Sequence, residues 1–366
     1  MTYIGIDLHS NRFTAHFQES NGRGRTASYL IDAQGKYMQR FLDELKDDDY
    51  VFIEASTNTF AFSDVIKDRV KKVVVIDPYQ FRQDMDRGKK TDKIDAQKLA
   101  KEGKYHVETG GDFLPEVYIV ERNVRTLRSL FTTYTLLSKE ITMVRNRIYS
   151  LFKENLKPYT RRAIFGVLRH DLDASGLAEE YKVQVQVLFE ILDHLLERRE
   201  AIKRRILLMG ESFIADIDIL VSISGVSVFV ALAMIADYGT IDRFQKAKQF
   251  SRYLRSTPRS EVSNERRKDG KTQKNGRKLA IKMLLQGLHH ALRENARVNT
   301  FFQRIKKSKG RCKARIAVTR KLFITIFHML KQREYYGHIN QTLHDKKMTE
   351  YIRLLNNHHK GIDSFS

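Results

Sequence analysis

The stretch Tyr3-Ile4-Gly5-Ile6-Asp7 begins the run of short apolar segments that decides the fold of the N-terminal part. Tyr3 to Ile6 predicts one strand, and Arg12 to Phe17 predicts a second. Turn residues at 21–24 precede a third apolar segment, Ala27 to Ile31. Three successive strands joined by short turns predict an antiparallel meander.

Helical and strand patterns alternate after this meander. We expect helices near 34–46, 59–69 and 92–101, and strands at 50–53 and 73–76. Such an alternation is typical of a mixed sheet flanked by helices. The sequence therefore predicts an α/β domain over residues 1–105.

Long amphipathic helices are expected in the middle of the chain. Apolar residues recur at spacings of three and four from Val120 to Leu151, which is coiled-coil spacing, and a second helical pattern runs from Val185 to Ile206. With Pro158 between them, the two helices can fold back as an antiparallel hairpin at 106–215. An apolar stripe left free on either helix would pair with a second subunit, so we expect a homodimer or tetramer; helices that pack only within one subunit are the alternative.

Charge is distributed very unevenly along the 366 residues, which carry a formal net charge of +22. Residues 1–102 hold 17 Lys and Arg and 17 Asp and Glu, whereas the remainder holds 49 and 27. A surplus of this size requires a polyanionic partner, above all nucleic acid. An anionic membrane surface fits less well, because the basic residues lie in Gly-rich and polar segments rather than on a strongly apolar helix.

No run of 18 apolar residues is available for a membrane span, so no membrane partner is expected. The first strand begins without a charged leader, and the lone Cys312 cannot form an intrachain disulfide. These features are typical of a reducing compartment, and we expect a cytoplasmic protein.

Four carboxylates in the N-terminal part are candidate metal ligands. Asp7 and Glu54 end two of the expected strands, and Asp92 and Asp95 share one face of a helix start. Mg²⁺ prefers oxygen ligands, and a two-metal clamp on a phosphodiester needs three or four carboxylates. Taken singly, each acid has an ordinary alternative role at a turn or a helix cap, as Asp77 before Pro78 illustrates.

The combination of motifs carries a resemblance to a known family. Gly5-Ile6-Asp7, Ile53-Glu54-Ala55 and the string from Lys90 to Ala96, Lys-Thr-Asp-Lys-Ile-Asp-Ala, look like the DEDD signature of the bacterial insertion-sequence transposases of family 110. In that family the N-terminal domain resembles the junction resolvase RuvC, an RNase H-like fold. The resemblance implies that Asp7, Glu54, Asp92 and Asp95 are catalytic residues that bind Mg²⁺, with Mn²⁺ as an alternative ion.

The resemblance continues in the C-terminal half. Ile223-Ser224-Gly225-Val226-Ser227 is similar to the family's Ile-Pro-Gly-Ile-Gly segment, and Gly270 to Gly276 matches its Gly-x₃-Lys-x-Gly string. Pro258 to Asn264 matches its Pro-x₄-Ser-Gly string, with Asn264 in place of glycine. The resemblance implies that Ser263 is the nucleophile, and Ser260 and Ser256 are nearby alternatives. Asparagine tolerates a left-handed backbone better than other non-glycine residues.

We expect a loop from Arg255 to Lys278 in which half of the last fourteen residues are basic. These cations can bind nucleic acid and stabilise a phosphoryl transition state; a purely electrostatic phosphate-binding loop is the alternative. They are Arg266, Arg267, Lys268, Lys271, Lys274, Arg277 and Lys278. Helices are expected at 279–293 and 314–332, within a mainly helical transposase domain at 216–340, followed by a polar tail at 341–366.

The sequence therefore predicts a transposase that catalyses magnesium-dependent strand cleavage, exchange and religation through a composite site of four carboxylates and a serine. The resemblance also implies a non-coding guide RNA that pairs with donor and target DNA. The main alternative is a RuvC-like junction nuclease that uses water as its nucleophile. A nucleic-acid-binding protein without catalysis is the third hypothesis.

Overall fold

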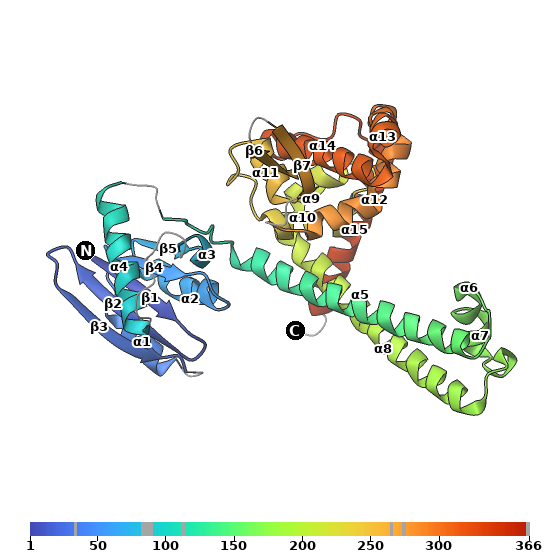
Figure 1. Ribbon diagram of the computed structural model, residues 1–366, viewed down its shortest axis with the longest axis horizontal. Coiled ribbons are helices and arrows are strands. Elements are labelled where there is room, and N and C mark those ends of the chain that lie inside the picture. The colour runs from blue at the N-terminus through green and yellow to red at the C-terminus, as the bar shows by residue number, and fades with distance from the viewer. Residues whose placement is uncertain (33–34, 82–90, 111–113, 264–265, 273–275, 364–366) are drawn as a thin grey trace. The chain divides into compact units, whose positions relative to one another are not determined.

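The computed structural model describes residues 1–32, 35–81, 91–110, 114–263, 266–272 and 276–363, without the side chains of residues 37, 258–272 and 360–363. The chain forms two compact units, Met1–Arg122 and Asn123–Ser366 (Figure 1). Each unit has its own hydrophobic core. Along the described part of the chain, no helix combines the length and apolar character needed to cross a bilayer.

The first unit is built on a five-stranded mixed sheet in the order β3-β2-β1-β4-β5. Its strands are β1 (Thr2–Leu8), β2 (Arg12–Glu19), β3 (Gly24–Leu30), β4 (Tyr50–Glu54) and β5 (Lys72–Ile76). β1 and β3 each pair with β2 in antiparallel register, whereas β4 pairs parallel with both β1 and β5. The predicted meander and mixed sheet are confirmed.

Helices cover both faces of this sheet. They are α1 (Lys36–Asp43), α2 (Thr59–Ile66), η1 (Lys67–Arg69), α3 (Pro78–Phe81) and α4 (Asp92–Glu108). Alternate residues of β1 and β4, such as Ile6 and Ile53, pack in one cluster with Phe41 of α1 and Phe62 of α2. The residues between them face α4, where Tyr3, Phe52 and Leu99 share a second cluster.

Among its described residues, the second unit is helical apart from one two-stranded ribbon. Its elements are α5 (Arg122–Glu154), α6 (Arg161–Ile164), α7 (Val167–His170), η2 (Asp173–Ser175), α8 (Glu179–Met209), η3 (Gly210–Phe213), α9 (Ile214–Val221), α10 (Val228–Tyr238), α11 (Ala247–Tyr253), β6 (Pro258–Ser263), β7 (Arg266–Thr272), α12 (Leu279–Glu294), α13 (Ala296–Lys309), α14 (Arg311–Gln332) and α15 (Gln341–Asp363). The C-terminal half of α5 packs against the N-terminal half of α8, with Ile148 and Val185 in one buried cluster. The two long helices therefore form the antiparallel hairpin that the apolar spacing predicts.

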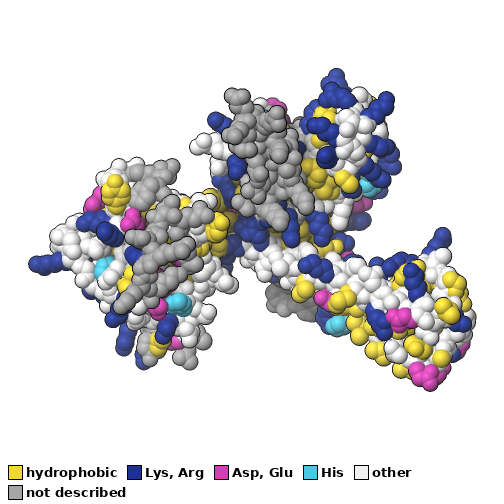
Figure 2. Space-filling model, in the orientation of Figure 1, with side chains coloured by type: hydrophobic (Ala, Val, Ile, Leu, Met, Phe, Trp, Pro, Cys, Tyr) yellow, Lys and Arg dark blue, Asp and Glu magenta, His cyan; other side chains and the backbone are white. Residues whose placement is uncertain are grey.

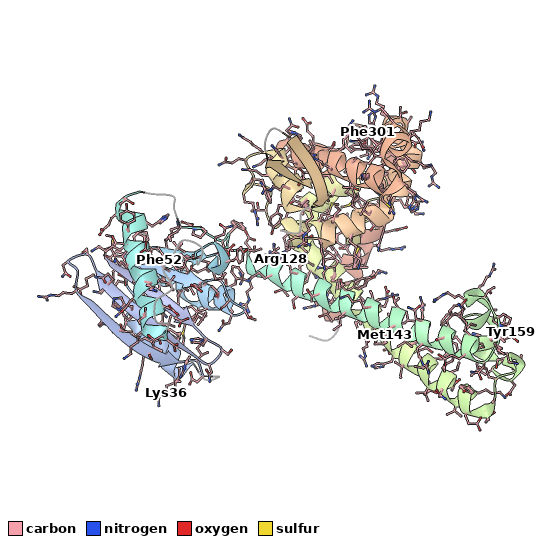
Figure 3. All side chains as sticks on the ribbon, in the orientation of Figure 1. Lys36, Phe52, Arg128, Met143, Tyr159 and Phe301 are labelled. Atoms are coloured by element: carbon pink, nitrogen blue, oxygen red, sulfur yellow. The ribbon has the colours of Figure 1, made fainter. Side chains whose placement is uncertain are left out.

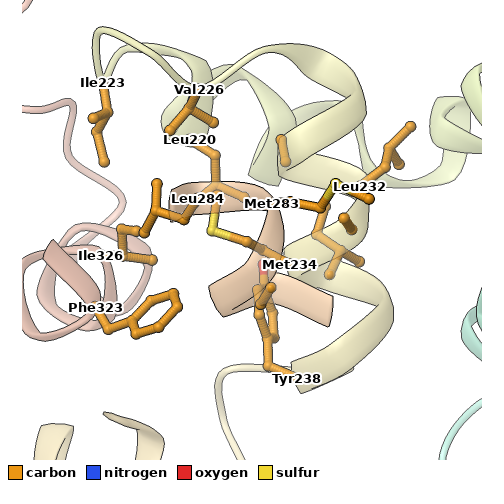
Figure 4. Packing of buried hydrophobic residues seen from close by; sticks show 14 of the residues in the cluster. Leu220, Ile223, Val226, Leu232, Met234, Tyr238, Met283, Leu284, Phe323 and Ile326 are labelled. Carbon is orange, nitrogen blue, oxygen red and sulfur yellow. The ribbon is translucent and has the colours of Figure 1, made fainter. Parts of the chain in front are cut away.

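The core of the second unit joins α9, α10, α12 and α14 (Figure 4). Gly225 and Gly287 make the closest approach, because a Cβ on Gly225 would lie 2.5 Å from the Gly287 carbonyl oxygen, and one on Gly287 would lie 2.2 Å from that of Gly225. The Lys347 ammonium donates to the carbonyl oxygens of Val221 and Val226 at 2.8 and 2.9 Å. Residues 223–227, the segment that resembles the family's Ile-Pro-Gly-Ile-Gly, are thus contacted by α12 through Gly287 and by α15 through Lys347.

Three segments differ from the sequence-based expectations. The expected loop at 255–278 contains the antiparallel β6–β7 hairpin, which the sequence conceals because its residues are mostly polar or charged. Helix α13 was not expected, since few of its residues are apolar. Residues 341–363, assigned above to a polar tail, form α15, which buries Met348, Tyr351 and Leu355 at spacings of three and four.

Candidate active site

The position of α4 on the sheet depends on Gly5 of β1. A Cβ at this residue would lie 2.1 Å from the carbonyl oxygen of Ala96 and 2.4 Å from the amide nitrogen of Ala100. Gly103 makes a similar approach to the ring of Phe52, labelled in Figure 3, which a Cβ would meet at 2.4 Å. Because both glycines lack a side chain, α4 lies directly on the strands that carry Asp7 and Glu54.

The first turn of α4 carries the other two predicted ligands, Asp92 and Asp95. Thr91 has an extended backbone, and its side-chain oxygen accepts a hydrogen bond from the Ile94 amide at 3.3 Å. Thr91 therefore caps the helix, and the Asp92 carboxylate is left available for other partners. The helix dipole stabilises negative charge at this end.

Asp7, His9 and Asp92 form one compact group, each offering a ligand atom within 4.8 Å of the others. The Nε2 atom of His9 lies 3.3 Å from Oδ2 of Asp7 and 3.5 Å from Oδ2 of Asp92. Burial raises the pKa of the Asp7 carboxyl; His9 opposes this shift, and the charges of Asp92 and Asp95 add to it. Two carboxylates and an imidazole thus converge at a point where negative charge is costly without a cation.

An open hollow of about 550 Å³ adjoins this group, lined by residues 8–12 and 56–58. Arg12, on its wall, places a guanidinium nitrogen 3.7 Å from Oδ2 of Asp92. The Asn58 side chain donates to the backbone oxygen of His9 at 2.8 Å and so ties the two lining loops together. The hollow therefore offers a cation, Arg12, next to the group formed by Asp7, His9 and Asp92.

The structure places Glu54 and Asp95 beside this group but not within it. Ile6 of β1 pairs with Ile53 of β4, so Asp7 and Glu54, the next residues, lie level on the face that α4 covers. Asp95 is close enough for its charge to raise the pKa of Asp7. Asp77 is a turn residue, as expected, since its Oδ1 accepts from the Tyr79 amide at 2.9 Å.

Sequence reasoning missed His9 and Arg12 at this site. His9 follows Asp7 by two residues at the end of β1, and Arg12 begins β2. Their contact with Asp92 depends on how the β1–β2 turn folds towards α4. The available signal was the polar run of residues 9–12 immediately after a strand that ends in an acid.

The predicted nucleophile lies in the second unit. Ser263 is the last residue of β6 and pairs with Arg266, the first of β7. Ser256 is buried and donates to the Ser251 carbonyl at 2.7 Å, which makes it a poor alternative, whereas Ser260 pairs with Asp269 within the hairpin.

The predicted nucleic-acid-binding residues follow the same hairpin. Arg266, Arg267, Lys268 and Lys271 lie on β7. Arg277 and Lys278 are exposed ahead of α12, while Asn264 and Lys274 fall outside the described residues.

Two family models match the sequence. The model of the IS110-type DEDD transposases matches residues 4–156, and that of the transposase IS116/IS110/IS902 family matches residues 217–303. The first contains all four carboxylates, and the second contains the β6–β7 hairpin. The chain belongs to the IS110 family of transposases. A search of curated proteins finds no match.

This transposase is accordingly an enzyme of DNA recombination, and its substrate is DNA. The DEDD assignment points to the use of a divalent metal ion, in agreement with the group formed by Asp7, His9 and Asp92. The RNase H-like fold expected of the N-terminal part agrees with the observed sheet.

Proposed function

We propose that the transposase binds Mg²⁺ at Asp7, Glu54, Asp92 and Asp95 and cleaves and rejoins DNA through Ser263. The convergence of Asp7 and Asp92 at the start of α4 is the observation that supports this function most strongly. Residues 1–105 supply the metal site, 106–215 the helical arm and 216–340 the serine. That the carboxylates and the serine act together in one active site is inferred from the family resemblance.

The donor set fits a hard divalent cation. Asp7 and Asp92 offer carboxylate oxygens, Glu54 follows a residue of β4 that pairs with the residue before Asp7, and Asp95 is close enough for its charge to raise the pKa of Asp7. A bound divalent ion would stabilise the charge that develops on the phosphodiester oxygens. His9, between the two acids, orients their carboxylates, and Arg12 at the hollow would bind an adjacent phosphate.

Ser263 would form a covalent link to DNA. Its hydroxyl oxygen forms a bond to phosphorus as the bond from phosphorus to one deoxyribose oxygen breaks; the serine proton passes to a base and the leaving oxygen gains a proton. Attack by a deoxyribose hydroxyl reverses these steps and releases the serine. The basic residues of β7 supply positive charge next to Ser263 in the strand register.

The experiment traps reactions on labelled DNA under denaturing conditions and compares the parent with Ser263→Ala and Ser260→Ala. We expect a protein–DNA adduct with the parent and with Ser260→Ala, and none with Ser263→Ala. An adduct that is lost only in Ser260→Ala moves the nucleophile to that residue. Cleavage without an adduct by a fully active Ser263→Ala variant establishes the junction nuclease, in which water attacks.

We propose that the α5–α8 hairpin joins subunits into a dimer or tetramer. Val183, Val187 and Ile191 of α8 are exposed at spacings of four residues, and Leu136 and Met143 are exposed on α5. Figure 2 shows hydrophobic side chains on the surface of this hairpin, and Met143 is labelled in Figure 3. A stripe of this kind on a solvent-facing helix is typical of a subunit interface.

Light scattering of the variant Val187→Lys/Ile191→Lys tests this interface. Both side chains are exposed, so the substitutions should leave the fold intact while they place charges in the proposed subunit interface. The expected result is a lower mass than that of the parent; Thr300→Lys/Gln303→Lys, which adds the same charge at two exposed residues of α13, is the control. An unchanged mass would show that the hairpin is not the subunit contact.

We also propose that a guide RNA from the insertion sequence occupies part of the basic second unit. The support is the family resemblance together with the cationic surplus after residue 102. Purification from cells that carry the complete element, followed by sequencing of retained RNA, should recover one element-encoded transcript. Recovery of unspecific cellular RNA alone would contradict the proposal.

A further inference from the structure

The helical pair α13–α14 carries charge of only one sign. From Ala296 to Gln332 the sequence holds eleven Lys and Arg and neither Asp nor Glu. Figure 2 shows Lys and Arg side chains gathered over these helices. Lys331 pairs with Asp242 from outside the segment. Because the segment itself holds no acid to neutralise the other cations, this surface attracts a polyanion.

A cavity of about 360 Å³ opens between α12, α13 and α14. Its apolar lining consists of Leu285, Leu288, Leu292 and Phe302. This lining belongs to the core of the second unit, so it is held in place whether or not a ligand is bound. A cavity of this size accepts a small planar group rather than a helix or a strand.

Three cations complete the lining: Lys306, Arg311 and Arg315. Arg315 is half-buried and donates to the Leu285 carbonyl oxygen at 2.7 Å, which fixes it across the cavity. Lys306 and Arg311 are exposed, and neither side chain forms an ion pair with the residues that the structure describes. They therefore retain their charge for a ligand.

Apolar walls beneath a cationic rim match one nucleotide, with its base inside and its phosphates outside. Free phosphate would use the cations and leave the apolar walls unfilled. A paired base is stacked on both faces within its duplex and cannot enter. The side chains of Gln286 and His289, which also line the cavity, provide hydrogen-bonding groups for a base edge.

We propose that this cavity binds one unpaired nucleotide of single-stranded DNA. DNA is the occupant because it is the substrate that family membership establishes, and strand exchange separates its strands. The inference rests on that DNA substrate and is independent of the metal site and of Ser263.

The test measures DNA binding by the full chain in EDTA, so that neither metal nor cleavage contributes. Two variants remove equal charge from the same two helices: Lys306→Ala/Arg311→Ala at the cavity, and Lys307→Ala/Lys313→Ala, which are exposed but do not line it. The probe is fluorescent oligothymidine of about 16 nucleotides, within the usual site size for single strands.

We expect the cavity variant to lose at least about tenfold more affinity for the single strand than the control variant does. Both variants should lose similar affinity for a paired duplex of equal length, because duplex binding depends on overall charge. If both variants lost equal affinity for the single strand, the cavity would contribute no more than the rest of the basic surface, and the proposal would be overturned.

Leu292→Phe fills the cavity without a change of charge. We expect weaker binding of oligothymidine and unchanged binding of the duplex, which also serves as the check on folding. Retention of full single-strand affinity would contradict insertion of a base. A preference of the parent for oligouridine over oligothymidine would assign the cavity to RNA instead.

Discussion

The two units of the transposase use charge in contrasting ways. Residues 1–122 hold 19 Lys and Arg and 21 Asp and Glu, whereas residues 123–366 hold 47 and 23. In the first unit, Asp7 of β1 and Asp92 of α4 converge at one end of the sheet, with Glu54 of β4 beside them. In the second, cations are spread along α13 and α14.

This difference shows that placement, more than net charge, indicates what a charged group does. A nearly neutral unit holds Asp7 and Asp92 so close that a cation is favoured between them. The strongly basic unit disperses its charge, as suits contact with successive phosphates of a nucleic acid. Five predictions test this contrast.

Loss of a carboxylate from the first unit should have the largest effect. We expect Asp7→Ala or Asp92→Ala to reduce strand exchange by roughly a thousandfold or more, because the metal ion loses a ligand. Recombination of a two-site plasmid measures the effect. Asp77→Ala removes an acid that follows the neighbouring strand β5 and should leave most activity intact.

The same variants should fold without metal. The pKa of Asp7 is raised by burial and by Asp92 and Asp95, so its ionised form is disfavoured in the folded state. At neutral pH, Asp7→Ala should therefore unfold at or above the parent's temperature in EDTA. Full activity in any two of the variants Asp7→Ala, Glu54→Ala, Asp92→Ala and Asp95→Ala would exclude the metal site.

His9 should have an intermediate effect. Since its imidazole lies between the two carboxylates, His9→Ala should raise the metal concentration needed for half-maximal activity by about 10–100-fold. Titration of activity with Mg²⁺ measures this shift, and excess metal should restore most of the rate. An unchanged metal dependence would remove His9 from the site.

Gly5 tests whether the carboxylate arrangement depends on backbone packing. In Gly5→Ala the added Cβ overlaps the backbone of α4, and we expect a loss of about 1–3 kcal/mol in unfolding free energy, with weaker metal binding. Gly337→Ala is the control, because a Cβ there meets nothing within 4 Å. Denaturant titration followed by circular dichroism compares the two, and equal stability would mean that α4 does not depend on Gly5.

The smallest effect concerns Asp237, a buried acid in the basic unit. Its Oδ2 accepts from the Ala280 amide at 2.7 Å, at the start of α12. Burial raises the pKa of Asp237 to about 6, although the Ala280 amide and the charges of Arg277 and Arg128 lower it. The folded state thus holds this proton more tightly than the unfolded state, and protonation adds stability as the pH falls through 6.

Comparison with Asp237→Asn isolates this group. Between about pH 7.5 and 5, the parent should gain on the order of 1–2 kcal/mol of stability relative to the variant. Denaturant titrations at both pH values measure this difference in unfolding free energy. Asp242 is an exposed acid, so Asp242→Asn is the control and should show no such pH-dependent difference from the parent. A constant difference between parent and Asp237→Asn would show that Asp237 stays ionised.

Elements with a regular apolar pattern were predictable from the sequence. β1 to β5, α5 and α8 were all expected close to where they occur, because alternation or helical spacing reports directly on a buried face. The carboxylates were also predictable, since Gly5-Ile6-Asp7 and the string from Lys90 to Ala96 are specific motifs.

Features that depend on tertiary contact were not predictable. The strands of the β6–β7 hairpin carry few apolar residues, so the segment was expected to be a loop. α15 was assigned to the polar tail because most of its residues are polar or charged, although Met348, Tyr351 and Leu355 keep helical spacing. His9 joins the carboxylates only once the β1–β2 turn lies beside α4, and the polar run of residues 9–12 does not by itself reveal that proximity.

The direct contact of α4 with the backbone at Gly5 has a consequence for how this enzyme can change over generations. Helix and strand are separated by no side chain at that point, so any larger residue displaces the end of α4 that carries Asp92 and Asp95. In a saturation library selected for transposition, Gly5 should tolerate as few replacements as the acids proposed to bind metal. Its mutational record would resemble that of a catalytic residue, although it touches neither metal nor DNA.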